Sequence, residues 1–208
     1  MGYRLVLLDL DSTLIADEVI DLLAREAGQA KFVSQITEQA MAGEMDFAEA
    51  LRKRVALLKD LPETVFQKLA TEITFSEGAN SLIDHCAANQ IPIGAVSGGF
   101  EHAVAALGLR ERLNFVRANR LEISNGKLTG RLSGPIIDAP AKARALLEFA
   151  AAFEIPISET IAIGDGANDI EMIKAAGLGI AFKGKPALRE AADQEITHSL
   201  AELIPLLR

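Results

Sequence analysis

The chain has 208 residues, of which 50% are hydrophobic and 24% charged, and its net charge is −8. This composition is typical of a globular protein with one core and room for a small additional module. The negative charge argues against nucleic acid and anionic membrane surfaces as partners, because both require a basic face.

The first expected element is a buried strand over residues 4–9, short and aliphatic, which runs into Asp9-Leu10-Asp11-Ser12-Thr13. Residues i and i+2 of a strand point to the same side, so Asp9 and Asp11 are expected to project together. Two like charges this close repel each other, and a divalent cation or a shared proton is the usual relief. The pattern indicates a site for metal-assisted phosphoryl chemistry.

The stretch from residue 18 to 74 carries helical patterns only. Gly28 and Gly43 are expected to end the first two helices, and Pro62 to open the fourth. Four short helices with short connections suggest a small bundle. Because this insert directly follows the paired carboxylates, we expect it to cover the site like a lid.

From residue 79 onward, helices alternate with strands, which implies a parallel sheet with right-handed crossovers. The expected strands cover residues 91–96, around 115–118, 160–163 and 179–182, with a hairpin at Asn125-Gly126. The expected fold is therefore α/β, a Rossmann-like parallel sheet core with a small helical cap domain inserted after the first strand. Residues 1–14 and 75–208 would form the catalytic core, and residues 15–74 the four-helix cap.

Three of the expected strands end in polar turns, which should meet because functional groups gather at the carboxyl ends of parallel strands. By itself, Gly164-Asp165-Gly166-Ala167-Asn168-Asp169 is equally well a tight turn with a helix cap. Beside a carboxylate pair on another strand, a metal site is the better interpretation. The oxygen ligands Asp9, Asp11 and Asp165, without a cluster of cysteine or histidine, indicate Mg²⁺ rather than Zn²⁺.

The other polar candidates each allow a plain structural interpretation. Ser97-Gly98-Gly99 is either a simple turn or a cradle for phosphate. Lys142, in the first turn of a helix, is either a solvated surface lysine or a cation aimed at a phosphate. The run Arg52-Lys53-Arg54 allows at most one arginine to face the site, and its spacing does not choose between them. Glu18 can be an ordinary acid at a helix N-terminus.

Together these residues resemble the haloacid dehalogenase-type phosphohydrolases. The motifs that carry the resemblance are Asp9-Leu10-Asp11-Ser12-Thr13, Ser97, Lys142 and Gly164-Asp165-Gly166-Ala167-Asn168-Asp169, in that order. Further segments narrow it to the phosphoserine phosphatase family: Glu18, Leu51-Arg52-Lys53-Arg54-Val55, Val96-Ser97-Gly98-Gly99-Phe100, Ala118-Asn119-Arg120-Leu121 and Ala162-Ile163-Gly164-Asp165. The resemblance covers nearly the whole chain.

The resemblance implies a Mg²⁺-dependent hydrolase that converts O-phospho-L-serine to L-serine and phosphate through an aspartyl phosphate, the last step of serine biosynthesis. Asp9 would be the nucleophile, and Asp11 the general acid that later acts as base. Mg²⁺ would bind Asp9, the backbone carbonyl of Asp11, and Asp165, while Asp169 would order water on the metal.

The same resemblance implies a set of substrate-binding residues. The phosphate oxygens would be held by Ser97, Gly98, Lys142 and Asn168. Glu18 suits the substrate ammonium and Arg54, rather than Arg52, the carboxylate. Met41 and Phe47 would be apolar cover that excludes water.

Two other functions stay open. A related phosphatase or phosphotransferase would act on another small phosphomonoester, and a non-enzymatic phospho-receiver would use a similar aspartate. Receivers are typically about 120 residues long and lack a lid.

We expect a cytoplasmic protein with a small-molecule substrate, since no apolar segment reaches the roughly 18 residues that cross a bilayer and no secretory leader is evident. For the proposed chemistry, Asp11 must carry a proton when the leaving group departs. The neighbouring Asp9 raises the pKa of Asp11, whereas a nearby Mg²⁺ lowers it.

Overall fold

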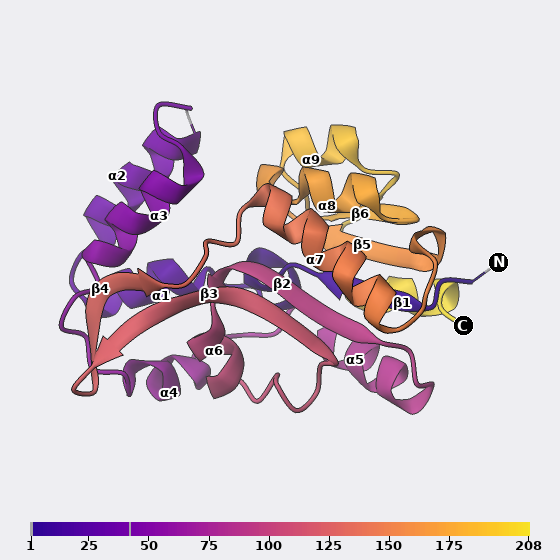
Figure 1. The fold of residues 1–208 in the computed structure, drawn as a ribbon, viewed down its shortest axis with the longest axis horizontal. Coiled ribbons are helices and arrows are strands. Elements are labelled where there is room, and N and C mark those ends of the chain that lie inside the picture. Colours follow the sequence, from indigo (N-terminus) through magenta and orange to yellow (C-terminus); the bar gives the residue numbers. More distant parts are fainter. Residues whose placement is uncertain (1, 42) are drawn as a thin grey trace.

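The computed structural model describes residues 2–41 and 43–208, in which the chain forms a seven-stranded sheet with helices on both faces (Figure 1). The strand order is β4-β3-β2-β1-β5-β6-β7, and each neighbouring pair is parallel except β3 and β4. The strands are β1 Leu5–Leu8, β2 Ile93–Phe100, β3 Phe115–Ser124, β4 Lys127–Ser133, β5 Thr160–Gly164, β6 Leu178–Phe182 and β7 Gln194–Ile196. The expected α/β fold with a parallel core is confirmed.

Helices cover both faces of the central strands, which explains why these strands are almost wholly aliphatic. Val6 and Leu8 of β1 belong to the apolar cluster that includes α5 and the C-terminal 3₁₀ helix, whereas Leu5 and Leu7 face α7 and α8. The helices of this part are α5 Ala79–Ala88, α6 Glu101–Ala106, α7 Ala139–Ala152, α8 Ile170–Ala175, α9 Pro186–Ala191 and the 3₁₀ helices Ile157–Glu159, Ala167–Asp169 and Leu200–Leu206. In the described part of the chain, no helix is both long and apolar enough to cross a membrane.

Two strands differ from the expected pattern. β2 continues through Ser97-Gly98-Gly99, where we expected a turn, and its pairing with β3 shifts register between Ser97 and Phe100. The irregularity leaves a polar kink inside a strand rather than after it. β7 was not expected, because Gln194–Ile196 is too short and too polar to show the alternation of a strand.

The helical insert contains α1 Val19–Glu26, α2 Ala30–Met41, α3 Phe47–Ala56 and α4 Val65–Ala70. Ile15 and Phe75 form an antiparallel bridge, so the insert leaves and rejoins the sheet part at one point. α2 packs against α3, while α3 also contacts β4 and α4 contacts α6 (Figure 1). The assignment of residues 15–74 to a separate cap domain stays a prediction.

Candidate active site

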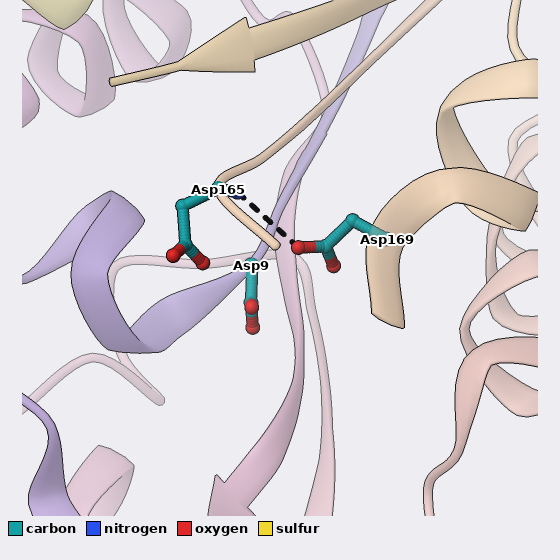
Figure 2. Close-up of side chains that lie close together, drawn as sticks. All are labelled: Asp9, Asp165 and Asp169. Atoms are coloured by element: carbon teal, nitrogen blue, oxygen red, sulfur yellow. Dashed lines mark hydrogen bonds between the residues drawn. The ribbon is translucent and has the colours of Figure 1, made fainter. Parts of the chain in front are cut away.

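Three buried carboxylates meet at the carboxyl end of the sheet. Asp9 follows β1, and Asp165 and Asp169 follow the neighbouring strand β5. Figure 2 shows the three side chains facing one another, and each offers a carboxylate oxygen within 4.8 Å of the other two. Such a set of oxygen donors fits a hard divalent cation. The three residues are therefore candidates to hold a metal ion, directly or through its water, and the convergence expected from the parallel sheet is present.

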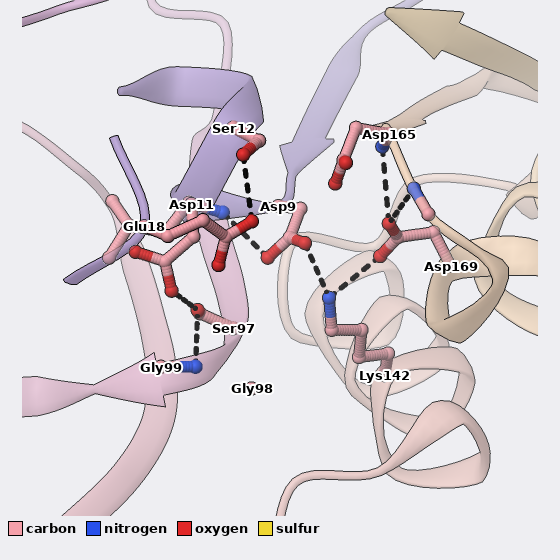
Figure 3. A network of polar contacts seen from close by, with 12 residues as sticks. Asp9, Asp11, Ser12, Glu18, Ser97, Gly98, Gly99, Lys142, Asp165 and Asp169 are labelled. Carbon is pink, nitrogen blue, oxygen red and sulfur yellow. Dashed lines mark hydrogen bonds and ion pairs between the residues drawn. The ribbon is translucent and has the colours of Figure 1, made fainter. Parts of the chain in front are cut away.

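Lys142 lies within this cluster and binds two of its members. It is the fourth residue of α7, a helix that begins after the cap residue Asp138. The Lys142 Nζ is 2.8 Å from Asp9 Oδ2 and 2.7 Å from Asp169 Oδ1, and the side chain is fully buried (Figure 3). The interpretation of Lys142 as a solvated surface lysine is therefore wrong. Burial alone would lower the pKa of Lys142, but the carboxylates of Asp169 and Asp9 outweigh it and raise the pKa.

The carboxylate of Asp9 is fixed from two sides. Its Oδ1 accepts a hydrogen bond of 2.7 Å from the backbone N–H of Leu10, and its Oδ2 pairs with Lys142. Burial and the neighbouring Asp169 raise the pKa of Asp9, and Lys142 opposes this rise. A bound divalent cation would also favour the ionised form.

The loop after β5 has a shape that depends on close approach. Asp169 Oδ2 accepts hydrogen bonds of 3.2 Å from the backbone N–H groups of Asp165 and Gly166. A Cβ atom on Gly164 would lie 2.3 Å from Asp169 Cγ, so a side chain there would displace Asp169. Asn168 is half-buried, with its Oδ1 atom lying against Gly166.

Asp11 lies beside the cluster but outside it. Its Oδ2 accepts from Ser97 Oγ at 3.4 Å and its Oδ1 from the backbone N–H of Val19 at 3.3 Å. A Cβ atom on Gly99 would lie 2.1 Å from Asp11 Oδ2, so the kink in β2 provides the space for this carboxylate. The Asn119 side chain stabilises the kink by donating to the Gly98 carbonyl at 2.8 Å.

Burial, followed by the nearby Glu18 carboxylate, raises the pKa of Asp11 to about 7. A carboxyl group with this pKa carries a proton for a large fraction of the time near neutral pH. Such a group can act as a general acid and, once ionised, as a base.

The backbone around Asp11 differs from the strand geometry that we expected. β1 ends at Leu8, and Leu10–Leu14 forms one irregular helical turn in which Ser12 has a φ of 55°. The expectation that Asp9 and Asp11 share one side of a continuous strand is therefore wrong, although both reach the same site. The left-handed Ser12 donates from its Oγ to Glu18 Oε1 at 2.7 Å (Figure 3).

The side chains from the insert are less enclosed. Arg54 is half-buried in α3 with its Nη1 3.4 Å from Thr37 Oγ1, whereas Arg52 is exposed. The structure thus favours Arg54 over Arg52 as the arginine that faces inward. Phe47 packs directly on the kink, since a Cβ on Gly98 would lie 3.1 Å from its Cζ. Met41 is 71% exposed at the end of α2 and is not brought into contact with the carboxylate cluster.

The sequence analysis missed Lys185. Its Nζ is 3.0 Å from Asp165 Oδ2, and its backbone N–H donates to the Asp165 carbonyl at 2.8 Å. The signal was present, because Lys183-Gly184-Lys185 is a polar, glycine-containing turn directly after an expected strand. Like Gly164–Asp169 after β5, it lies at the carboxyl end of the sheet.

The sequence matches the haloacid dehalogenase-like hydrolase family over residues 6–174. The chain belongs to that family. Among these hydrolases, it is 46% identical to the phosphoserine phosphatase of Streptococcus thermophilus, with 98% of this chain and 95% of the relative covered. It is 48% identical to the phosphoserine phosphatase SerB2 of Mycobacterium tuberculosis and 50% identical to that of Streptomyces coelicolor, covering 98% and 91% of this chain. The chain spans about half the length of these last two relatives, 50% and 46%.

Solved structures of phosphoserine phosphatases also superpose on the whole chain. A substrate-bound phosphoserine phosphatase complex is 42% identical and superposes with a TM-score of 0.91, with 100% of both chains covered. A phospho-aspartyl intermediate analogue of phosphoserine phosphatase, also 42% identical with full coverage of both chains, gives 0.90. The resemblance to the phosphoserine phosphatase family that we noted from the sequence motifs is confirmed.

Proposed function

We propose that the protein is a Mg²⁺-dependent phosphatase that hydrolyses O-phospho-L-serine to L-serine and phosphate. The observation that carries this proposal is the arrangement of the two acids of the first motif. Asp9 lies ionically paired within the cluster of buried carboxylates, and Asp11 beside it has a pKa of about 7. One acid is thus placed to attack phosphorus, while the other can hold the proton that the leaving group needs.

The two chemical steps follow from these roles. In the first, an Asp9 oxygen forms a bond to phosphorus as the bond from phosphorus to the serine oxygen breaks, and Asp11 gives its proton to that oxygen. In the second, the Asp11 carboxylate takes a proton from water, whose oxygen attacks phosphorus and releases Asp9. The hydrogen bond from Leu10 and the ion pair with Lys142 hold the nucleophile in one orientation throughout.

We assign the cation to Asp9, Asp165 and the backbone carbonyl of Asp11, with Asp169 ordering water around it. The fit rests on the buried group of Asp9, Asp165 and Asp169, in which Asp9 and Asp165 would bind the cation directly and Asp169 would act through water. When bound, Mg²⁺ supplies positive charge that stabilises the transferring phosphoryl group. Lys142 adds a second positive charge at Asp9 Oδ2, whereas the Leu10 N–H donates to Oδ1.

Substrate recognition is assigned to both parts of the chain. Phosphate oxygens would be held by Ser97, Gly98, Lys142 and Asn168. Glu18 would bind the substrate ammonium and Arg54 the carboxylate, with Phe47 and Met41 as the apolar cover of a cap formed by residues 15–74. In support, burial lowers the pKa of Arg54, and the carboxylates of Asp21 and then Glu18 oppose this fall, so the guanidinium and the Glu18 carboxylate act on each other across the same space. A place in serine biosynthesis and in the cytoplasm follows from this activity as part of the proposal.

The test compares L-phosphoserine with phosphoethanolamine, which lacks the carboxylate. Arg54→Ala should raise KM for phosphoserine roughly 10-fold to 100-fold, as expected for loss of a charge-assisted pair, with KM for phosphoethanolamine little changed. Arg52→Ala is the matched control and should leave both unchanged. Equal effects of Arg54→Ala on the two substrates would refute the carboxylate assignment.

The same assays separate the alternatives. Transfer of phosphate to an added alcohol in preference to water would identify a phosphotransferase. A higher kcat/KM for a different phosphomonoester would identify another substrate. Phosphorylation without turnover would identify a receiver.

A further inference from the structure

A lysine from a fourth strand end reaches the candidate metal ligands. Lys185 lies beyond the end of β6, and its Nζ is 3.0 Å from Asp165 Oδ2. Its backbone N–H donates to the carbonyl of the same aspartate at 2.8 Å. Lys185 therefore contacts Asp165 through both its main chain and its side chain.

The base of this lysine is held in place by the loop. Lys185 is extended, with φ −66° and ψ 154°, and directly precedes Pro186, the first residue of α9. A residue before proline is restricted to this region, so the sequence itself favours the extended backbone at Lys185. Two residues earlier, the backbone N–H of Lys183 donates to the Ile196 carbonyl at 2.8 Å, which attaches the loop to β7.

The two lysines of the site divide the three carboxylates between them. Lys142 pairs with Asp9 and Asp169 and has no exposed side-chain surface. Lys185 pairs with Asp165, and 53% of its side chain is exposed against 9% for Asp165. If Lys142 left the cluster, the buried carboxylates of Asp9 and Asp169 would lose their shared partner. Lys185, in contrast, can move its ammonium into water because its side chain is long and flexible.

The surroundings of Lys185 are acidic as well. Burial by itself would lower the pKa of Lys185, but Asp165, and further away Glu18 and Asp169, outweigh it and raise the pKa. The ammonium thus lowers the repulsion that remains among these acids after Lys142 has paired with Asp9 and Asp169.

We propose that Lys185 is a positioning residue that sets the affinity of the site for the divalent cation: it neutralises Asp165 in the cation-free protein and opposes the cation when it binds. This inference rests on the metal site of the proposed function. The Asp165 oxygen that accepts from Lys185 must be shared with the metal cation or given up to it. The Lys185 ammonium and the metal cation also repel each other at this separation. For both reasons the lysine weakens binding of the metal cation. In return, the cation-free cluster is kept compact and partly neutral.

The test measures binding of Mg²⁺ itself to the substrate-free protein by calorimetry, with Mn²⁺ followed by electron paramagnetic resonance as a second readout. Lys185→Met removes the charge and keeps the length, and we expect it to bind Mg²⁺ about tenfold more tightly at low salt. The gain should shrink as ionic strength increases, because part of the repulsion passes through solvent. Lys185→Arg retains the charge and should bind as the wild type does.

Lys183→Met is the matched control. Lys183 lies on the same loop, but its ammonium is placed over the Phe182 ring, 5.1 Å from the centroid. The variant makes the same change in net charge and should leave Mg²⁺ affinity unchanged. If Lys183→Met tightened binding as much as Lys185→Met, the effect would be one of overall charge, and the proposal would be overturned.

Thermal unfolding distinguishes this role from a purely structural one. Lys185→Met should unfold at a lower temperature than the wild type without cation, and saturating Mg²⁺ should raise its Tm by more than it raises that of the wild type. An equal loss with and without Mg²⁺, or an unchanged or weaker Mg²⁺ affinity, would overturn the inference and leave the metal site standing. Failure of the folded wild type to bind Mg²⁺ would overturn both.

Discussion

The sheet and the helical insert contribute to the site in different ways. The groups from the sheet are enclosed and joined by ion pairs: Asp9 is 3% exposed, and Lys142 and Asp169 are fully buried. The groups from the insert are more open, with Arg54 half-buried and Met41 71% exposed. The charges that we propose to act on phosphorus are therefore held in position by packing, whereas those that we propose to recognise the rest of the substrate are more open to solvent.

This difference predicts which property each kind of substitution should change. On the sheet side, a change removes both a catalytic group and a partner of a buried charge, so kcat and stability should fall together. On the insert side, a change should alter KM and leave the fold intact.

Loss of the nucleophile gives the largest expected effect. Asp9→Asn removes the attacking oxygen anion, and kcat should fall by at least about 10⁴-fold. The exposed Asp60→Asn is the control and should keep full activity. Steady-state release of phosphate, with circular dichroism to confirm folding, measures the result. Substantial turnover by a folded Asp9→Asn protein would remove Asp9 as the nucleophile.

Loss of the buried Lys142 should have the second-largest effect. It tests whether stability and kcat fall together on the sheet side. Lys142→Met leaves Asp9 and Asp169 buried without their shared partner, so the free energy of unfolding should fall by about 3–5 kcal/mol. We expect kcat to fall roughly 10²-fold to 10³-fold in the same protein. Lys53→Met, at an exposed ion pair with Glu49, should change stability by under about 1 kcal/mol. Urea unfolding compares the two, and equal losses would contradict the difference between buried and open charges.

The raised pKa of Asp11 predicts how stability varies with pH in the cation-free protein. Its pKa is about 7 in the folded protein and 3.8 in its ordinary environment, so the folded state binds more protons between these values. The free energy of unfolding should therefore decrease as pH rises from about 4 to about 7, by up to about 4 kcal/mol from this group. Asp11→Asn should remove that part of the slope when unfolding is followed with a chelator present. An unchanged slope in Asp11→Asn would show that Asp11 does not hold its proton.

The contact between insert and sheet gives the smallest expected effect. Gly98→Ala places a methyl group 3.1 Å from Phe47 Cζ, which forces the ring to move and should raise KM severalfold at nearly constant kcat. Phe47→Ala removes the obstacle, so the double variant should have a smaller effect than the sum of the two single variants. A double-mutant cycle on KM measures this coupling. Additive effects would mean that the Phe47 ring does not act on Gly98.

Much of the site could be predicted from the sequence because parallel sheets bring strand ends together. Once strands were recognised before Asp9, near Ser97 and before Asp165, the order of elements was enough to expect one shared edge. The paired Asp9 and Asp11 needed only local sequence. The roles of Glu18 and Arg54 came from family resemblance and not from spacing.

Other features depend on contacts distant in sequence and could not be predicted. The burial of Lys142 follows from acids on two other loops, Asp9 and Asp169, so a lysine in a first helical turn gave no sign of it. The left-handed backbone of Ser12 is balanced by its bond to Glu18, six residues later. The proton on Asp11 depends on how deeply the carboxyl is buried, which spacing does not report.

A rapid-quench experiment with phosphoserine labelled at phosphorus tests most directly whether Asp9 is the group that attacks. During turnover with Mg²⁺, the acid-quenched protein should carry label on Asp9, identified by peptide mapping, and the label should disappear on a chase with unlabelled substrate. Label on any other residue would contradict the assignment. So would full turnover at substrate saturation with no covalent label at any quench time, if the Asp9→Asn variant also stays active.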